Sequence, residues 1–217
     1  MRLYFKLTPN KELVPFDYMH NLVGVFHKWL GKNELHDSIS LYSLSWLKGG
    51  RQNKHGLDFK EGAVWFISAY DELLCKNLIA GAFEEPDFFC GMKVTDVMIQ
   101  ENPSFEKSKK FILASPILIK HFDGKLLKHR TFEEEDTNQI MTDILITKLK
   151  KTNINPEVSV RFDLSYEKAK TKLVKIKNIN NKANMCPVII QGNPEAITFA
   201  WNVGIGHSTG SGFGALV

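Results

Sequence analysis

The chain has 217 residues, of which 43% are hydrophobic and 24% charged, and its formal net charge is +4 at pH 7. This length fits one large domain or two small ones, and the composition is that of a globular protein rather than a disordered one. No apolar run approaches the roughly 20 residues of a membrane helix and no signal peptide is evident, so we expect a cytoplasmic protein without a membrane partner.

The first hundred residues carry alternating strand and helix patterns. Leu3, Phe5 and Leu7 alternate with other residues and predict a half-buried strand over 2–7. A helix is predicted over 15–30, with an apolar stripe formed by Phe16, Met19, Val23, Phe26 and Leu30. Further patterns predict strands at 39–47 and 63–68, a helix at about 70–82 and a strand at 92–100. The order βαββαβ is the ferredoxin-like arrangement.

A second round of elements follows a polar linker at about 102–110. We expect a strand over 111–119, at an edge or bulge because of Pro116. A long helix over 131–151 has acids first and lysines last, which suits the helix dipole. Strands at 158–164, 173–179 and 187–191, a short helix at 194–202 and a closing strand at 212–217 complete the set. The sequence thus predicts an α+β protein of two tandem ferredoxin-like domains, 1–105 and 106–217.

The C-terminal segment carries five of the 15 glycines in a Gly–apolar–Gly, five residues, Gly–apolar–Gly pattern. These are Gly204, Gly206, Gly210, Gly212 and Gly214. Glycines let a backbone approach a ligand closely, and such a segment offers amide N–H groups to phosphates. Ile205 and Phe213 are expected to anchor the two ends in a core. The structural alternative is a tight turn that binds nothing.

The residues before this segment predict a helix, because Asn193 is a good N-cap and Pro194 fits the first turn. A Walker loop would need Gly-Lys-Ser/Thr, which is absent, and a Rossmann loop should follow a first strand. The glycine pattern and its helix resemble the C-terminal signature of the Cas six family, CRISPR-associated repeat-processing endoribonucleases among the repeat-associated mysterious proteins. A weaker resemblance is Leu113-Ala-Ser-Pro-Ile-Leu-Ile119 at the start of the second domain.

The resemblance implies an endoribonuclease that cleaves CRISPR precursor RNA within its repeats, in antiviral defence. The 2′-OH would be the nucleophile, giving 2′,3′-cyclic phosphate and 5′-OH ends. We expect neither a metal nor another cofactor. Cys75, Cys90 and Cys186 form no Cys-x-x-Cys pair, and Asp87 and Asp96 are isolated. CRISPR repeat RNA is the expected partner; a homodimer and transfer of the product to effector proteins stay open.

Histidines are the expected proton carriers, because an imidazole pKa of about 6.5 suits transfer to or from a ribose oxygen. His36 lies in Leu35-His-Asp37, where the family often has a catalytic histidine, after the first helix. His27, at the margin of the apolar stripe, falls where a second catalytic residue is implied, and His20 is the alternative. Each of these histidines also fits an ordinary surface position.

The sequence offers two candidates for the group that would stabilise the negative charge of the phosphorane. Some family members add a lysine shortly after the loop histidine, where this chain has Ser38 or Ser40. Lys48 or Arg51, beside Gly49-Gly50, are the candidates for catalytic support, unless this segment is a plain solvated turn.

The predicted RNA-binding residues come from the glycine-rich segment and from a lysine-rich strand. Ammonium groups along a strand face suit a phosphate backbone, although a charge run is often only a solvated surface. The predicted set is Gly204, Gly206, His207, Ser208, Gly210, Gly212, Gly214, Lys170, Lys172, Lys175, Lys177 and, on a strand expected to be adjacent, Arg161.

Two other functions remain open. One is a non-catalytic RNA-binding module of the same fold in a CRISPR effector complex. The other is a ferredoxin-like metabolic or regulatory domain that binds a small anion.

Overall fold

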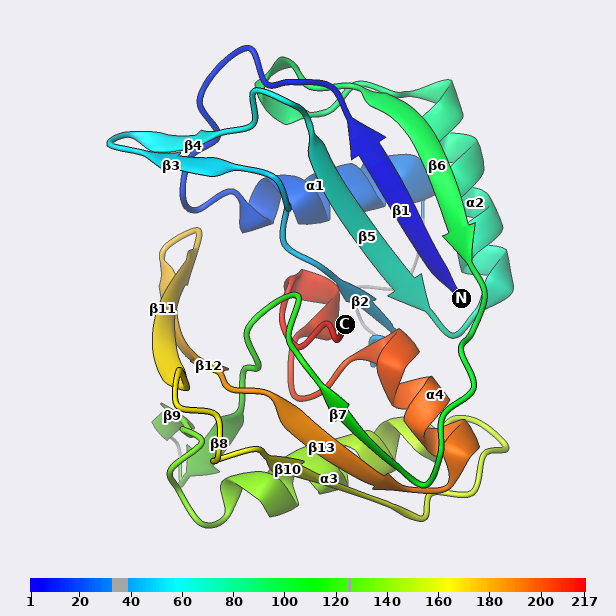
Figure 1. The fold of residues 1–217 in the computed structure, drawn as a ribbon, viewed down its shortest axis with the longest axis vertical. Coiled ribbons are helices and arrows are strands. Elements are labelled where there is room, and N and C mark those ends of the chain that lie inside the picture. The colour runs from blue at the N-terminus through cyan, green and yellow to red at the C-terminus, as the bar shows by residue number, and fades with distance from the viewer. Residues whose placement is uncertain (33–38, 125) are drawn as a thin grey trace.

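The computed structural model describes residues 1–32, 39–124 and 126–217, and Figure 1 shows them as two halves, one above the other. The N-terminal half contains, in order, β1 (Arg2–Leu7), α1 (Met19–Leu30), β2 (Tyr42–Leu44), β3 (Arg51–Asn53), β4 (Gly56–Asp58), β5 (Ala63–Ala69), α2 (Glu72–Glu84) and β6 (Val94–Gln100). The C-terminal half contains β7 (Ser108–Phe111), β8 (Lys120–Asp123), β9 (Leu126–His129), α3 (Thr137–Leu149), β10 (Val158–Phe162), β11 (Lys170–Ile176), β12 (Ile179–Met185), β13 (Val188–Gly192) and α4 (Pro194–Val203). None of the helices described is both long and apolar enough to cross a membrane.

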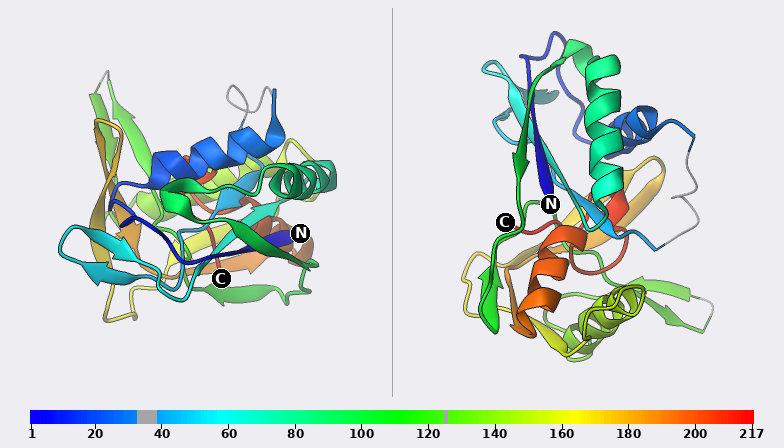
Figure 2. Two further views of the ribbon diagram at one scale, coloured as in Figure 1. Left: turned by 90° about the horizontal axis from the view of Figure 1, so that it is seen from above. Right: turned by 90° about the vertical axis from the view of Figure 1, so that its right-hand side faces the viewer.

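The N-terminal sheet has the strand order β2-β5-β1-β6, with every pair antiparallel. Helices α1 and α2 cover the same face of this sheet (Figure 2). The ferredoxin-like order predicted for this half is confirmed, with one addition: a hairpin, β3–β4, stands outside the sheet between β2 and β5.

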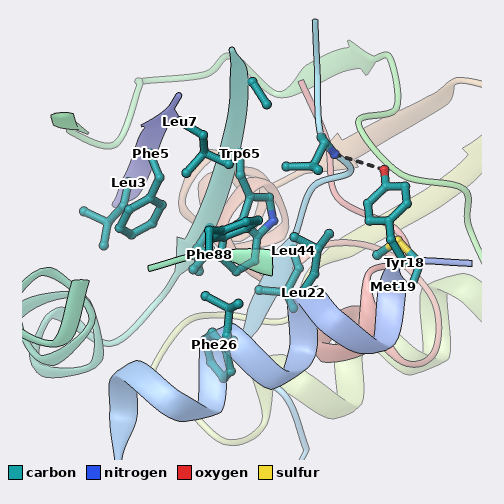
Figure 3. Packing of buried hydrophobic residues seen from close by; sticks show 14 of the residues in the cluster. Leu3, Phe5, Leu7, Tyr18, Met19, Leu22, Phe26, Leu44, Trp65 and Phe88 are labelled. Atoms are coloured by element: carbon teal, nitrogen blue, oxygen red, sulfur yellow. Dashed lines mark hydrogen bonds between the residues drawn. The ribbon is translucent and has the colours of Figure 1, made fainter. Parts of the chain in front are cut away.

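Hydrophobic alternation in β1 produces the core of this half. Leu3 and Phe5 are fully buried and Leu7 is 4% exposed, because successive side chains of a strand point to opposite faces. The Phe5 ring packs against Trp65 with centroids 5.8 Å apart. Figure 3 shows this cluster and, beside it, the Tyr18 hydroxyl that accepts a hydrogen bond from the Leu47 N–H.

Helices α1 and α3 begin later than their sequence patterns suggest. Residues 16–18 form a turn and α1 begins at Met19, so Phe16 is 52% exposed and is not part of the buried stripe. Likewise, the acids at 133–136 precede α3 rather than occupying its first turn. For α4 the predicted start is confirmed: the Asn193 side chain accepts from the Glu195 N–H, and Pro194 is the first helical residue.

The C-terminal half repeats the topology with only three sheet strands, in the order β10-β13-β7. The predicted strand over 111–119 is wrong: β7 ends at Phe111, and residues 112–119 make only isolated bridges. Pro116 lacks an N–H and cannot take part in a regular ladder. The predicted closing strand over 212–217 is also wrong. Gly212 and Gly214 have positive φ, which is not an extended conformation, and the segment makes an isolated bridge between Leu216 and Leu113.

Two hairpins of this half were not predicted. The lysine-rich strand is β11, and it turns at Lys177, which has φ +52°, into β12. The prediction had placed a single strand over 173–179. The second hairpin, β8–β9, stands apart from the three-stranded sheet.

The side chain of Arg2 connects the two halves although only 1% of it is exposed. Its guanidinium lies between the Phe66 ring (4.0 Å) and the Trp201 ring (3.8 Å). It also donates to the Ser68 hydroxyl at 2.6 Å and to the Leu216 carbonyl at 2.7 Å. Burial lowers the pKa of Arg2 to about 10. Arg2 and Phe66 belong to the N-terminal half, and Trp201 and Leu216 to the C-terminal half.

Candidate functional site at the glycine-rich turn

The glycine-rich segment forms a tight turn over 204–214 that lies between the two halves. Four of its glycines have φ between +65° and +85°, and Ser208 has φ +58°, a region that disfavours side chains. Ile205 is buried in the hydrophobic cluster of the C-terminal half, and Phe213 in that of the N-terminal half. The predicted anchoring of the turn by these two residues is therefore confirmed.

Close packing explains two of the glycines. A Cβ at Gly210 would lie 2.8 Å from the Tyr42 hydroxyl and 2.6 Å from the Ser40 hydroxyl, and one at Gly214 would collide with the Ile205 carbonyl. A larger residue at 210 would therefore push the turn away from Ser40 and Tyr42, and one at 214 would separate the two ends of the turn.

The turn offers fewer bare N–H groups than its sequence suggests. The N–H groups of Ile205, His207 and Gly214 donate to carbonyls of the protein at 2.8 to 2.9 Å. A ligand at the turn therefore cannot use these three groups.

A cavity of about 610 Å³, which we call the turn cavity, opens beside these residues. Its walls come from α3, from the start of β8 and from the residues before β2. The described residues that line it are Ile39, Ser40, Lys120, Ile140, Asp143, Ile144, Thr147, Lys148, Gly206, His207, Ser208, Thr209 and Ser211.

His207 is a hydrogen-bond donor in this cavity rather than a proton carrier near pH 7. Its Nδ1 accepts from the Lys120 N–H at 3.1 Å, so the proton of the neutral ring is assigned to Nε2. Burial, followed by the charges of Lys120 and Lys148, lowers the pKa of His207 to about 4. The Lys120 ammonium donates to the Ser208 hydroxyl at 3.1 Å, so a cation, a hydroxyl and an imidazole gather at the turn.

A hydrogen-bonded chain beneath the turn joins both halves. Lys148 of α3, only 4% exposed, donates to the Val203 carbonyl at 3.1 Å and to the Thr209 hydroxyl at 3.0 Å. Thr209 in turn donates to the Tyr42 carbonyl of β2 at 2.9 Å. Burial lowers the pKa of Lys148 to about 7. The turn is thereby held against α3 on one side and β2 on the other.

A second cavity, of about 920 Å³, lies between the hairpins β3–β4 and β11–β12, and we call it the hairpin groove. The N-terminal half contributes Phe16, Trp46 and His55 among others, and the C-terminal half contributes residues 172–175. The Lys172 ammonium lies 4.4 Å from the Trp46 ring centroid. The Trp46 indole N–H donates to the Gly212 carbonyl at 2.9 Å, so the glycine-rich turn lines the turn cavity and contacts a residue that lines the hairpin groove.

The predicted catalytic residues are only partly described. His36 lies outside the described residues. His27 is half-buried on α1 with its ring edge-on to Phe26, at the margin of the core as predicted. His20 is exposed in the first turn of α1 and donates to the Asp17 carbonyl. Within the described ranges, neither His20 nor His27 lines the turn cavity.

The predicted RNA-binding residues divide between the cavities. Gly206, His207 and Ser208 line the turn cavity, whereas Lys172 and Lys175 line the hairpin groove. Two other lysines predicted to bind RNA lie elsewhere: Lys170 is beside Lys168 in a smaller pocket, and Lys177 is at the hairpin tip. Of the two cations predicted to support catalysis, Lys48 has its ammonium 5.7 Å from the Phe66 ring centroid, and Arg51 is on β3. Arg161 does not extend the lysine row, because β10 pairs with β13 and not with β11.

Sequence reasoning missed Lys120, Lys148 and Trp46. Lys148 carries a recognisable signal, since it lies among Leu145 and Leu149 on the buried face of α3, where a lysine is unusual. Its position near the helix end had a sufficient alternative explanation in the helix dipole. Lys120 and Trp46 carry no recognisable sequence signal, because each lies in a segment that only the tertiary fold brings to the turn. Within the described residues no group of three or more His, Cys, Asp or Glu side chains could hold a metal ion.

Comparison with known proteins identifies the same region. The family model of the CRISPR-associated protein Cas6, C-terminal, matches residues 99–217. No curated protein matches the chain. Among solved structures, one described as the product of a Cas6-related gene from Pyrococcus furiosus has a TM-score of 0.86 at 19% identity, covering 100% of this chain and 97% of that one. An RAMP protein described as binding different RNA substrates gives 0.85 at 19%, covering 100% and 98%. A Thermus thermophilus Cas6 product complex gives 0.72 at 13%, covering 100% and 98%. At these identities the structural matches establish the fold, of tandem ferredoxin-like type.

Proposed function

This chain belongs to the CRISPR-associated Cas6 family, and from that premise we propose that it is a metal-independent endoribonuclease that cleaves CRISPR precursor RNA within repeats. The ribose 2′-OH attacks the adjacent phosphorus, and the products carry a 2′,3′-cyclic phosphate and a 5′-OH. The observation that carries the proposal is the turn cavity, where the family's glycine-rich segment gathers Lys120, His207 and Ser208.

These residues have roles that follow from their charge and hydrogen bonding. The neutral His207 ring donates from Nε2 and the Lys120 ammonium carries positive charge, so both suit the negative charge that develops on a phosphorane. With its pKa lowered to about 4, His207 is not placed to exchange protons near pH 7. Lys48 and Arg51, the cations first considered for this role, are not among the described residues lining the cavity, so we assign it to Lys120.

Proton transfer then falls to histidines outside the described lining. We propose His36 as general acid or base, with His27 as its complement. His36 lies three residues before Ile39, which lines the turn cavity. Three residues of chain span at most about 10 Å. This assignment rests on the sequence position of His36.

The proposed chemistry predicts cleavage that needs no divalent cation. A repeat transcript from the native locus should be cut at the same rate with and without excess EDTA, because the nucleophile is part of the RNA and the charges are supplied by side chains. A single 2′-deoxy substitution at the cut site should abolish product, with gel analysis of the 5′ and 3′ fragments as the measurement. Cleavage that EDTA stops, or that survives the 2′-deoxy substitution, would contradict the proposal.

The hairpin groove suits an unpaired stretch of the same RNA. Exposed aromatic rings stack on bases, and lysines attract the backbone. Phe16 is half exposed, and Lys172 and Lys175 stand on the opposite wall. Because the glycine-rich turn lines one cavity and bonds to Trp46 in the wall of the other, we propose that one RNA strand extends from the groove to the turn cavity.

Fluorescence of Trp46 should report occupation of the groove. All four tryptophans are described, and the other three are at most 4% exposed. Repeat RNA with a single-stranded flank should therefore quench the emission in the wild-type protein but not in Trp46→Phe. Phe16→Ala should weaken binding of the flanked RNA by ~1–3 kcal/mol through lost stacking.

Phe83→Ala is the matched control for Phe16→Ala. Phe83 is 65% exposed on α2 and does not line the groove, so its substitution should leave the affinity unchanged. Equal losses in the two variants would remove the groove from the RNA path without affecting the assignment of the turn cavity.

A further inference from the structure

Lys148 is a cation enclosed at the turn, and among the residues that the structure describes it has no counter-ion. Its side chain lies on the buried face of α3 and lines the turn cavity. Within residues 1–32, 39–124 and 126–217, no carboxylate lies within ion-pair distance of its Nζ. The acid of the described lining, Asp143, is exposed and accepts a hydrogen bond from Gln139.

The hydrogen bonds of Lys148 leave part of its capacity unused. An ammonium has three protons, and the two acceptors within the described residues are the Val203 carbonyl and the Thr209 hydroxyl. Both acceptors are neutral. A buried cation that lacks a counter-charge is unfavourable and tends to lose its proton, which agrees with a pKa that burial lowers to about 7.

We propose that Lys148 supplies the counter-charge for the RNA phosphodiester seated on the glycine-rich turn, and that seating this phosphodiester draws a proton onto the Lys148 Nζ. The inference rests on the proposed function for the identity of its ligand, but concerns binding and not the bond that is cut. The phosphodiester gains the third ammonium proton as a donor, beside Lys120, Ser208 and His207. No covalent bond of the RNA changes in this step, and the proton comes from the solvent.

The pH dependence has a definite sign. Above about pH 7 the Lys148 amine is increasingly neutral in the free protein and becomes protonated when the anion binds. Binding therefore takes up a proton, and the affinity falls as pH rises above 7, by at most about tenfold per pH unit. The other titratable groups of the described lining are His207, Lys120 and Asp143, with Tyr42 behind Thr209.

The test uses repeat RNA with a 2′-deoxy residue at the cut site, which cannot be cleaved. Calorimetry at pH 8 in two buffers with different ionisation enthalpies measures protons taken up per RNA bound. The wild-type protein should take up close to one proton. Lys148→Met, which keeps an unbranched stem without a charge, should bind more weakly and remove this uptake. Lys148→Arg stays charged throughout, so it should bind without proton uptake and with an affinity that no longer falls between pH 7 and 9.

Two controls separate this role from a structural one. Lys150→Met removes an exposed lysine from the same end of α3 and should leave proton uptake and affinity unchanged. Lys120→Met removes the second cation of the cavity and should weaken binding while uptake persists. If Lys148→Met fails to fold, Lys148→Arg still decides the question. Uptake equal to wild type in either Lys148 variant would overturn the inference. Failure of the proposed function would instead appear as wild-type protein that leaves all-ribose RNA uncut, whatever the proton count.

Discussion

Replacing His36 by alanine should slow cleavage of repeat RNA by about 10²- to 10⁴-fold, the usual contribution of a general acid or base. The affinity for the same RNA should stay within about twofold, because phosphate contacts dominate binding and the role proposed for His36 is proton transfer. Single-turnover cleavage rates and fluorescence anisotropy of an uncleavable RNA measure the two quantities separately.

The matched control is His20→Ala, since His20 is an exposed histidine of α1 that does not line the turn cavity. This variant should cut at the wild-type rate. Loss of both cutting and binding in His36→Ala would make His36 an RNA-binding residue and contradict its assignment as proton carrier. If the wild-type protein binds the RNA but never cuts it, the rival function is correct: a non-catalytic RNA-binding module of an effector complex. Salt-sensitive binding to repeat RNA, absent for unrelated RNA, would exclude the other rival, a metabolic or regulatory domain that binds a small anion.

Replacing Arg2 by alanine should lower the free energy of unfolding by ~2–4 kcal/mol. The substitution removes a guanidinium stacked between Phe66 and Trp201, leaves a cavity and deprives the Leu216 carbonyl of its donor. Urea denaturation followed by circular dichroism measures the change.

Two further substitutions identify which part of Arg2 matters. Arg2→Met should cost less than Arg2→Ala, because it fills the space and relieves the burial of a charge. Arg2→Lys should recover little, since an ammonium has neither the planar stacking surface nor the fixed donors of a guanidinium. A loss below about 0.5 kcal/mol in Arg2→Ala would place Arg2 among ordinary surface residues and contradict its role as a connection between the halves.

The regular part of the fold was predictable because it depends on local patterns. Alternation in β1 and β10 and the capping pair Asn193-Pro194 marked these elements closely. Predictions failed where apolar residues are buried without being in a sheet. Residues 117–119 are completely buried, yet they form a segment that holds the turn, and hydrophobicity alone does not distinguish this from a strand.

The site was predictable only where its residues are close together in the sequence. The glycine spacing located the turn, and with it His207 and Ser208. It did not reveal that His207 is kept neutral, because the burial of its ring, and the nearby charges of Lys120 and Lys148 from β8 and α3, depend on tertiary packing. Nor could it pair Trp46 with Lys172, which lie in opposite halves of the chain. Contacts of this kind depend on how the halves pack.

Ile205 is buried in one hydrophobic cluster and Phe213 in the other. This arrangement decides whether one half can fold without the other. The proposed boundary near residue 105 divides the two sheets but not the two cores. A fragment beginning there would carry Phe213 and Leu118 without the cluster that buries them. The C-terminal half therefore completes the interior of the N-terminal half, and exchanging one half between relatives would require matching side chains at the turn.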